Sequence, residues 1–210
     1  MALITTERQE LVQRGRSLEY FTIGYNSAEG AVSLLAGLTA GSVSLVGFGL
    51  DSLIEVMSGI ALLWRLHHDV NEARREAVER TARRIVGWCF IALAVYVATD
   101  SVLALMRHDK SGPSRVGILV AGLSVVVMPL LARAKRKVAK HIGSAALESD
   151  SKQADFCAYL SAILLVGLLL NAVLGWWWAD PLAALVMVPI IANEGVKSIK
   201  GKSCQHCGCE

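Results

Sequence analysis

Charged residues are scarce in this chain of 210 residues. Asp, Glu, Lys and Arg together make up 19% of it, whereas hydrophobic residues make up 54% and the mean hydropathy is +0.48. A soluble domain usually carries roughly a quarter charged residues. The composition therefore excludes an ordinary soluble protein and favours one that lies in a lipid bilayer.

Residues 1–17 lack the features of a secretory signal peptide. They carry charged side chains such as Glu7, Arg8 and Arg14, and no apolar core followed by a cleavage site of small residues. We expect them to form a short cytosolic segment. The formal net charge is only +3, and the basic residues cluster at the ends of apolar segments, so we expect no nucleic-acid partner.

Six apolar segments, each about as long as a helix needs to be to cross a bilayer, occupy most of the chain and leave no room for a second folded domain. We predict an all-α integral membrane protein with a six-helix transmembrane domain over residues 18–199 and a cytosolic tail over residues 200–210. The charged run 67–84 is expected to continue a helix beyond the bilayer, and the basic run 133–140 to form a loop. The predicted helices cover residues 18–38, 42–66, 85–106, 116–132, 144–175 and 179–199.

The basic residues predict an orientation in the membrane. One side of the predicted bundle collects most of the Lys and Arg, and the other keeps only Arg107, Lys110 and Arg115. By the positive-inside rule the basic side is cytosolic, which places both termini in the cytosol, most simply at a plasma or inner membrane. The three tryptophans at 176–178 suit the opposite interface.

Two carboxylates lie inside the second apolar segment. Asp51 and Glu55 are four residues apart, which puts both on one face of a helix, and no basic residue precedes Arg65 in that segment. Ionisable groups inside a membrane helix cost roughly 2.5 to 3.5 kcal/mol each, so they are rarely present without a partner or a task. Adjacent anions repel each other unless a cation or a proton lies between them. We interpret the pair as a cation site.

The fifth segment repeats this pattern. Glu148, Ser151 and Asp155 fall at helical spacing on one face, at a depth comparable to that of the first pair, so the two sets could face each other. Hard oxygen donors of this kind suit a divalent cation. The alternative is that these acids pair with Lys152 or cap the start of the helix.

The first segment adds Asn26 and Glu29, three residues apart, as candidate supporting or entry groups for this site.

Histidine is absent from the apolar segments. All five His residues, at positions 67, 68, 108, 141 and 206, lie in predicted loops or in the tail. A membrane metalloprotease needs imidazole or a nucleophile within the bilayer, so this absence argues against an enzyme.

Three motifs in this order resemble the cation diffusion facilitators, six-helix exporters of divalent metals. Residues 41–45 (GSVSL) leading to residues 51–55 (DSLIE) resemble the second helix of that family. Residues 149–155 (SDSKQAD) are similar to its fifth helix, and residues 178–184 (WADPLAA) to the start of its sixth. The similarity spans most of the chain.

The resemblance implies a divalent metal exporter whose site lies between the second and fifth helices. Asp51, Glu55 and Asp155 are then the ligands, with Ser151 a weaker one and Glu148, Asn26 and Glu29 close by. Zinc is the favoured metal. Manganese, iron or cobalt are alternatives, because Ser151 stands where zinc exporters of the family place His, and Glu55 replaces a commoner Asp.

Transport by such a site is expected to exchange metal for protons, because carboxylates must release protons to bind metal. The metal is the cargo, so we expect no cofactor. A membrane-embedded sensor or scaffold that binds metal without moving it needs the same ligands and stays open as an alternative. Only a short tail follows Ile199, whereas the family often adds a folded cytosolic domain, so a homodimer is expected to use the membrane helices.

The five cysteines of the chain fall into two groups. Cys204, His206, Cys207 and Cys209 form a compact cluster of soft ligands in the tail, which is interpreted either as a site of metal acquisition or as a tail with incidental thiols. Cys89 and Cys157 lie in apolar segments and are interpreted as packing residues.

Overall fold

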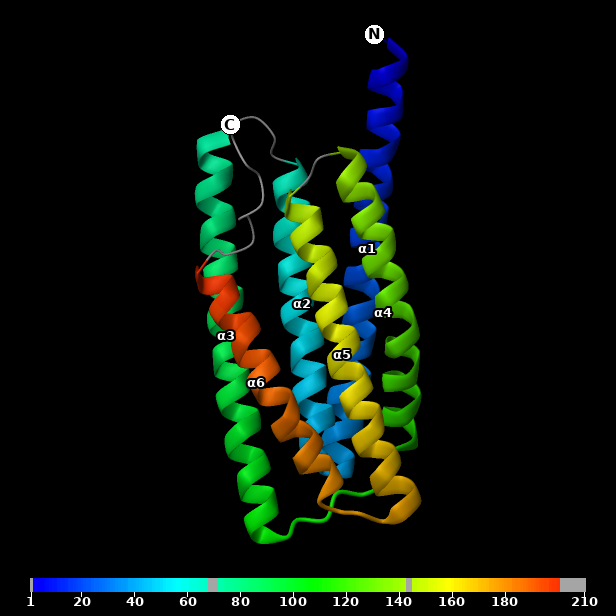
Figure 1. The fold of residues 1–210 in the computed structure, drawn as a ribbon, viewed down its shortest axis with the longest axis vertical. Helices are drawn as coiled ribbons and strands as arrows, with labels where there is room; N and C mark the ends of the chain where they lie inside the picture. The colour runs from blue at the N-terminus through cyan, green and yellow to red at the C-terminus, as the bar shows by residue number, and fades with distance from the viewer. Residues whose placement is uncertain (1, 68–71, 143–144, 201–210) are drawn as a thin grey trace.

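The computed structural model describes residues 2–67, 72–142 and 145–200, and these residues contain α-helices and short connections but no strand (Figure 1). Each of the six described helices starts or ends within two residues of its predicted bounds at one end at least. The six helices are α1 (Ala2–Ala40), α2 (Val43–His67), α3 (Glu72–Arg107), α4 (Arg115–Ile142), α5 (Ala145–Leu174) and α6 (Ala179–Lys200).

The basic run 133–140 is part of α4, whereas the sequence analysis placed it in a loop. No Gly or Pro interrupts this stretch, so the helix continues to Ile142. Its buried residues keep helical spacing through Leu131, Lys135 and Val138. One of the lysines counted as a loop residue therefore lies inside the bundle.

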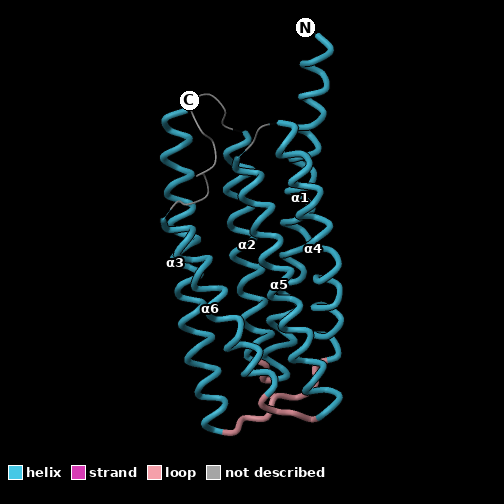
Figure 2. Tube along the Cα trace, viewed as in Figure 1, coloured by secondary structure: helices cyan, strands magenta, loops and turns pink. Residues whose placement is uncertain are grey.

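Successive helices run in opposite directions. The described connections at 41–42, 108–114 and 175–178 all lie at one end of the bundle, called here the loop end (Figure 2). The start of α1, the end of α4 and the start of α5 lie at the other, called here the terminal end (Figure 1).

Glycine ends two helices at the loop end. Gly41 and Gly175 follow α1 and α5 with φ of +64° and +65°, in the left-handed region that glycine adopts without a steric penalty. Ser42 N donates to Gly37 O at 3.0 Å, and Gly175 N donates to Asn171 O at 3.0 Å. These bonds satisfy carbonyls that the end of a helix otherwise leaves free.

The outer surface of the bundle is apolar over much of its length. Large side chains such as Trp88, Leu119 and Val173 are more than 60% exposed. Within the described residues, five helices, all except α1, contain a stretch long and apolar enough to cross a membrane. An apolar surface of this extent belongs in lipid, and the chain is an integral membrane protein.

Four helices form a closed ring, and two lie beside it. In the ring, α1 packs on α2 and α4, and α5 packs on α4 and α2. The α3 and α6 helices pack on each other and contact the ring through α2 and α5 (Figure 1). The sequence left open whether the second and fifth helices touch, and the structure places them in contact.

The α3–α6 contact gives a test of the fold. A Cβ atom at Gly87 would lie 2.9 Å from Gly195 O and 3.0 Å from Ile199 N, both backbone atoms, so α3 and α6 would have to move apart. We expect Gly87→Ala to cost about 1–3 kcal/mol, the usual range for overpacking, and to lower the melting temperature in detergent. Gly24→Ala is the control, because a Cβ there meets nothing within 4 Å. Equal melting temperatures for the two variants would contradict this packing.

Candidate metal site in the helical ring

The buried polar residues of α1 form a single stripe that faces the inside of the ring. All are less than 5% exposed, and they recur every three or four residues, which keeps them on one face of the helix. The stripe also explains why the described part of α1 lacks the long apolar stretch that the other five helices contain. Its members are Glu19, Thr22, Asn26, Glu29 and Ser33.

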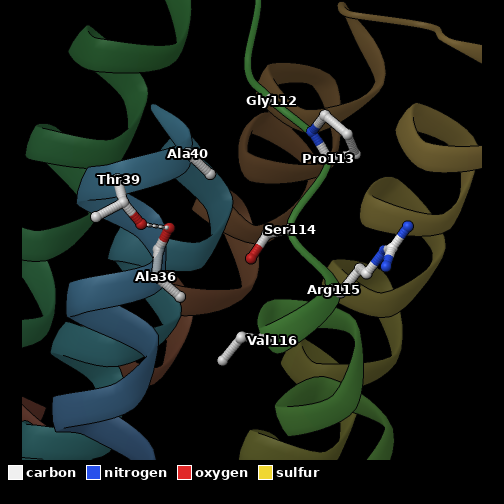
Figure 3. A pocket seen from close by; sticks show the side chains of 8 residues that line it. All are labelled: Ala36, Thr39, Ala40, Gly112, Pro113, Ser114, Arg115 and Val116. Atoms are coloured by element: carbon white, nitrogen blue, oxygen red, sulfur yellow. Dashed lines mark hydrogen bonds between the residues drawn. The ribbon is translucent and has the colours of Figure 1, made fainter.

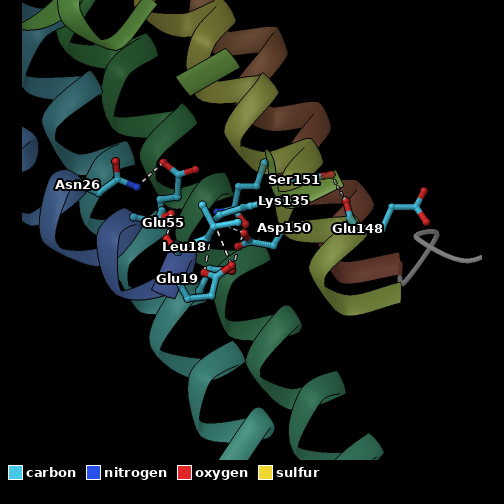
Figure 4. A network of polar contacts seen from close by, with 11 residues as sticks. Leu18, Glu19, Asn26, Glu55, Lys135, Glu148, Asp150 and Ser151 are labelled. Atoms are coloured by element: carbon cyan, nitrogen blue, oxygen red, sulfur yellow. Dashed lines mark hydrogen bonds and ion pairs between the residues drawn. The ribbon is translucent and has the colours of Figure 1, made fainter. Parts of the chain in front are cut away.

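Asp51 and Glu55 lie on the face of α2 that meets this stripe. They are 2% and 3% exposed, so neither is solvated by water or lipid headgroups. Asn26 Nδ2 donates a hydrogen bond to Glu55 Oε2 at 2.7 Å (Figure 4). The predicted proximity of Asn26 to the carboxylate pair is therefore present as a direct contact.

A second contact joins the same two helices closer to the loop end. Ser52 Oγ donates to Glu29 Oε2 at 3.0 Å. Beyond it, Ser161 Oγ of α5 donates to Ser124 Oγ of α4 at 2.9 Å. All four helices of the ring thus contribute polar side chains to its interior.

Several buried oxygens in the ring have no hydrogen-bond donor among the residues that the structure describes. They are Asp51 Oδ2, Glu29 Oε1 and Asn26 Oδ1. Buried oxygens without a donor are costly, and a cation can satisfy them. Within the described parts of the chain, no three His, Cys, Asp or Glu side chains already converge as metal ligands, so a metal would have to draw these donors together.

The structure does not bring Asp155 to Asp51 and Glu55. Its side chain is 35% exposed and forms an ion pair with Arg136 of α4. The face of α5 that lines the ring passes through Ala154 and Cys157, and Asp155 lies about 100° around the helix from Ala154, as follows from 3.6 residues per turn. The expected role of Asp155 as a ligand is therefore not supported by its position.

Glu148 and Ser151 also lie apart from the carboxylate pair. Glu148 is half-exposed and pairs with Lys152 at 3.4 Å, which was the alternative considered for these acids. Ser151 is buried, but its hydroxyl donates to the Glu148 carbonyl oxygen at 2.7 Å. The Glu148 carboxylate is thus paired with Lys152, and the Ser151 hydroxyl is bonded within its own helix.

Cys157, and not Asp155, lies on the face of α5 that lines the ring. The residue is 1% exposed, and its thiol lies close enough to the carboxylates of Asp51 and Glu55 to interact with them. Its place in an apolar segment predicts only a packing role. The sequence carries no signal that separates Cys157 from the other small residues of its apolar run, and only the structure shows that it shares a buried face of α5 with Ala154 and Ser161.

Lys135 is the second residue that the sequence analysis missed. It is fully buried and forms ion pairs with Glu19 of α1, at 3.2 Å, and with Asp150 of α5 (Figure 4). These three residues lie on the terminal-end side of the Asn26–Glu55 contact.

Asp180 holds the start of α2 at the loop end. Its carboxylate accepts bonds from Ser42 Oγ at 2.6 Å, from Val43 N at 3.0 Å and from Ser44 Oγ. The acid thus caps the helix that carries Asp51 and Glu55. The predicted start of the sixth helix at residue 179 agrees with the start of α6 at Ala179.

A pocket of about 440 Å³ lies at the loop end, between the end of α1 and the start of α4 (Figure 3). Its only charged lining residue is basic, so it does not suit a cation. The pocket is lined by Ala36, Thr39, Ala40, Gly112, Pro113, Ser114, Arg115 and Val116. The tail cluster of Cys204, His206, Cys207 and Cys209 lies outside the described residues.

Comparison with known proteins places the chain in a family. Residues 22–202 match the cation efflux transmembrane domain. Among similar proteins, the cation-efflux pump FieF of Shewanella oneidensis is 24% identical over 80% of this chain and 60% of its own length. Transmembrane protein 163 of Xenopus laevis is 26% identical over 80% of this chain and 62% of its own.

The magnetosome protein MamB of a Magnetospira species is 23% identical over 85% of this chain and 61% of its own length. The chain thus spans about three fifths of the length of these relatives.

The Asp180 cap gives a test of how the site is positioned. Asp180→Ala leaves the Ser42 and Ser44 hydroxyls and the Val43 N–H without their acceptor, and hydrogen bonds to a charged group contribute about 1.5–3 kcal/mol each. We expect a large fall in the melting temperature in detergent. Asp109→Ala, which removes an exposed acid at the same end, should change it little. A similar melting temperature for both variants would show that Asp180 does not hold α2.

Proposed function

Because the chain belongs to the cation efflux family, we propose that it exports a divalent metal cation across the membrane, with Asp51 and Glu55 as the main ligands. One observation carries this proposal: two buried carboxylates lie four residues apart inside the ring, next to oxygens that lack a hydrogen-bond donor. A divalent cation neutralises both anions at once and satisfies those oxygens.

The direction of transport follows from the charges at the two ends of the bundle. The terminal end carries basic residues such as Arg14, Arg80, Lys137 and Lys140, whereas the loop end carries Arg107, Lys110 and Arg115. By the positive-inside rule the terminal end faces the cytosol of a plasma or inner membrane. Export then moves the metal from the terminal end to the loop end.

Protons are the proposed counter-ion. Carboxylates and thiols bind metals in their deprotonated forms, so each binding event releases protons into the site. The protons displaced by the metal leave to the side from which it enters, and when the metal leaves at the other side, the same groups take up protons there. The result is exchange of one metal for protons through a single site.

Flux measurements test this proposal. Purified protein in liposomes should move Zn²⁺ when a pH gradient is imposed, and Asp51→Asn should reduce the rate more than about tenfold, since the loss of supporting groups alone costs 10–100-fold in affinity or activity. Asp155→Asn is the matched control, because Asp155 pairs with Arg136 outside the ring, and it should retain most of the rate.

Each outcome of the flux experiment has a distinct meaning. Full flux in Asp51→Asn would reject the proposed site. Metal binding without any flux would favour a membrane-embedded sensor or scaffold. Unchanged flux with the gradient collapsed, and without counter-movement of protons, would reject antiport.

Zinc is the favoured cargo, and Cys157 supports this choice. A thiolate beside two carboxylates suits Zn²⁺, Cd²⁺ or Co²⁺ better than Mn²⁺, because sulfur is a softer donor than oxygen. With Asp155 turned toward Arg136, Cys157 is the donor that α5 offers. Asn26 can add an amide oxygen from α1.

Cobalt reports on this ligand directly. In protein whose tail cysteines are replaced by Ser, Co²⁺ should produce the ultraviolet absorption of a sulfur-to-cobalt bond. Cys157→Ser should abolish that band and lower Zn²⁺ flux relative to Mn²⁺ flux, whereas Cys89→Ser should change neither. If the band persists in Cys157→Ser, or if the ratio of Zn²⁺ to Mn²⁺ flux is unchanged, the cysteine is not a ligand.

A further inference from the structure

Lys135 is a charged residue in a place where a charge is costly. Its side chain is 1% exposed, and its ammonium lies 3.2 Å from Glu19 Oε1 and also pairs with Asp150, whose side chain is 6% exposed. An ammonium buried this far from water is stable only when it is paired. The pairing therefore joins three helices, α1, α4 and α5, through one atom (Figure 4).

These three residues, called here the ion lock, lie between the terminal end and the candidate metal site. Glu19 precedes Asn26 by seven residues on α1, which is about 10 Å along a helix. On α5, Asp150 precedes Cys157 by the same seven residues. Lys135 is also close enough to Glu55 for the two charges to interact. A cation that moves from the terminal end toward Glu55 therefore meets the ammonium first.

An apolar layer continues the closure toward the terminal end. It is a separate cluster of buried residues, and all four helices of the ring contribute to it. This layer excludes water from the ion lock, which keeps the ion pairs strong. Its members are Leu62, Val138, Ala139 and Leu147, with Leu18 packed against them.

We propose that Glu19, Lys135 and Asp150 are the closed gate of the terminal end. The positive charge of Lys135 repels an incoming cation, and its two ion pairs hold α1 against α4 and α5. Access to Asp51 and Glu55 from this end requires Lys135 to leave at least one of its two partners. The inference relies on the proposed function only for the identity of the ion that passes, since the closure itself concerns access of any solute.

Cys157 provides a native reporter for this gate, because its buried thiol adjoins Glu55. In a background where Cys89, Cys204, Cys207 and Cys209 are replaced by Ser, Cys157 is the only thiol. The protein is placed in lipid nanodiscs, so that both ends are accessible, and treated with a membrane-impermeant cationic thiol reagent. The rate of modification is followed by mass spectrometry, which requires no metal and no transport.

Lys135→Gln should increase this rate at least about tenfold over the parent protein, because the opening equilibrium of a sealed site sets the labelling rate. Lys137→Gln is the matched control, since it removes an exposed lysine from the same helix, and it should leave the rate unchanged. If Lys135→Gln does not yield folded protein, Glu19→Gln is used instead. It leaves the pair of Lys135 with Asp150 and should give a smaller acceleration.

A third variant separates a gate from general loosening. Asn171 Nδ2 donates to Ser111 O and Ser111 Oγ, both at 3.1 Å, at the loop end. Asn171→Ala should lower the melting temperature without accelerating modification of Cys157. The gate is rejected if Lys135→Gln and Glu19→Gln label at the parent rate, or if Asn171→Ala labels as fast as Lys135→Gln. A failure of metal flux would reject the proposed function and leave this result standing.

Discussion

Every charge inside this bundle must be solvated by the protein itself, because lipid tails and apolar side chains provide no hydrogen bonds. The interior nevertheless holds Glu19, Glu29, Asp51 and Glu55 at less than 5% exposure. The ring of four helices meets this constraint by turning its polar faces inward. The amide of Asn26, the hydroxyl of Ser52 and the ammonium of Lys135 each supply a donor to one of these carboxylates.

The negative charges of the buried carboxylates are not equally well compensated along the ring. Near the terminal end, Glu19 and Asp150 are compensated by a full positive charge. In the middle, Glu55 accepts a hydrogen bond from Asn26, and Asp51 Oδ2 has no donor among the described residues. A bundle optimised for stability alone would not keep carboxylates in that condition, since an apolar pair of similar size costs less. The incomplete solvation of Asp51 and Glu55 is what a transient cation can complete.

The positions that sequence could predict are those fixed within one helix. Asp51 and Glu55 share a face whatever the other helices do, because four residues make about one turn. The six apolar segments and the acid at the start of the sixth helix follow from local composition in the same way. The position of Asp155 could not be predicted in this way, because its orientation depends on the rotation of α5 against α2 and on Arg136, a partner from another helix.

The positions of Lys135 and Cys157 in the bundle could not be predicted from the sequence either. In the sequence, Lys135 is one basic residue among several, and Cys157 is one small residue in an apolar run. The sequence by itself determined the class of protein, the number of helices and the presence of a carboxylate pair in the second. Only the tertiary structure decided which groups meet that pair and which lysine is enclosed, because side chains from separate helices come together through the packing of whole helices and not through spacing along the chain.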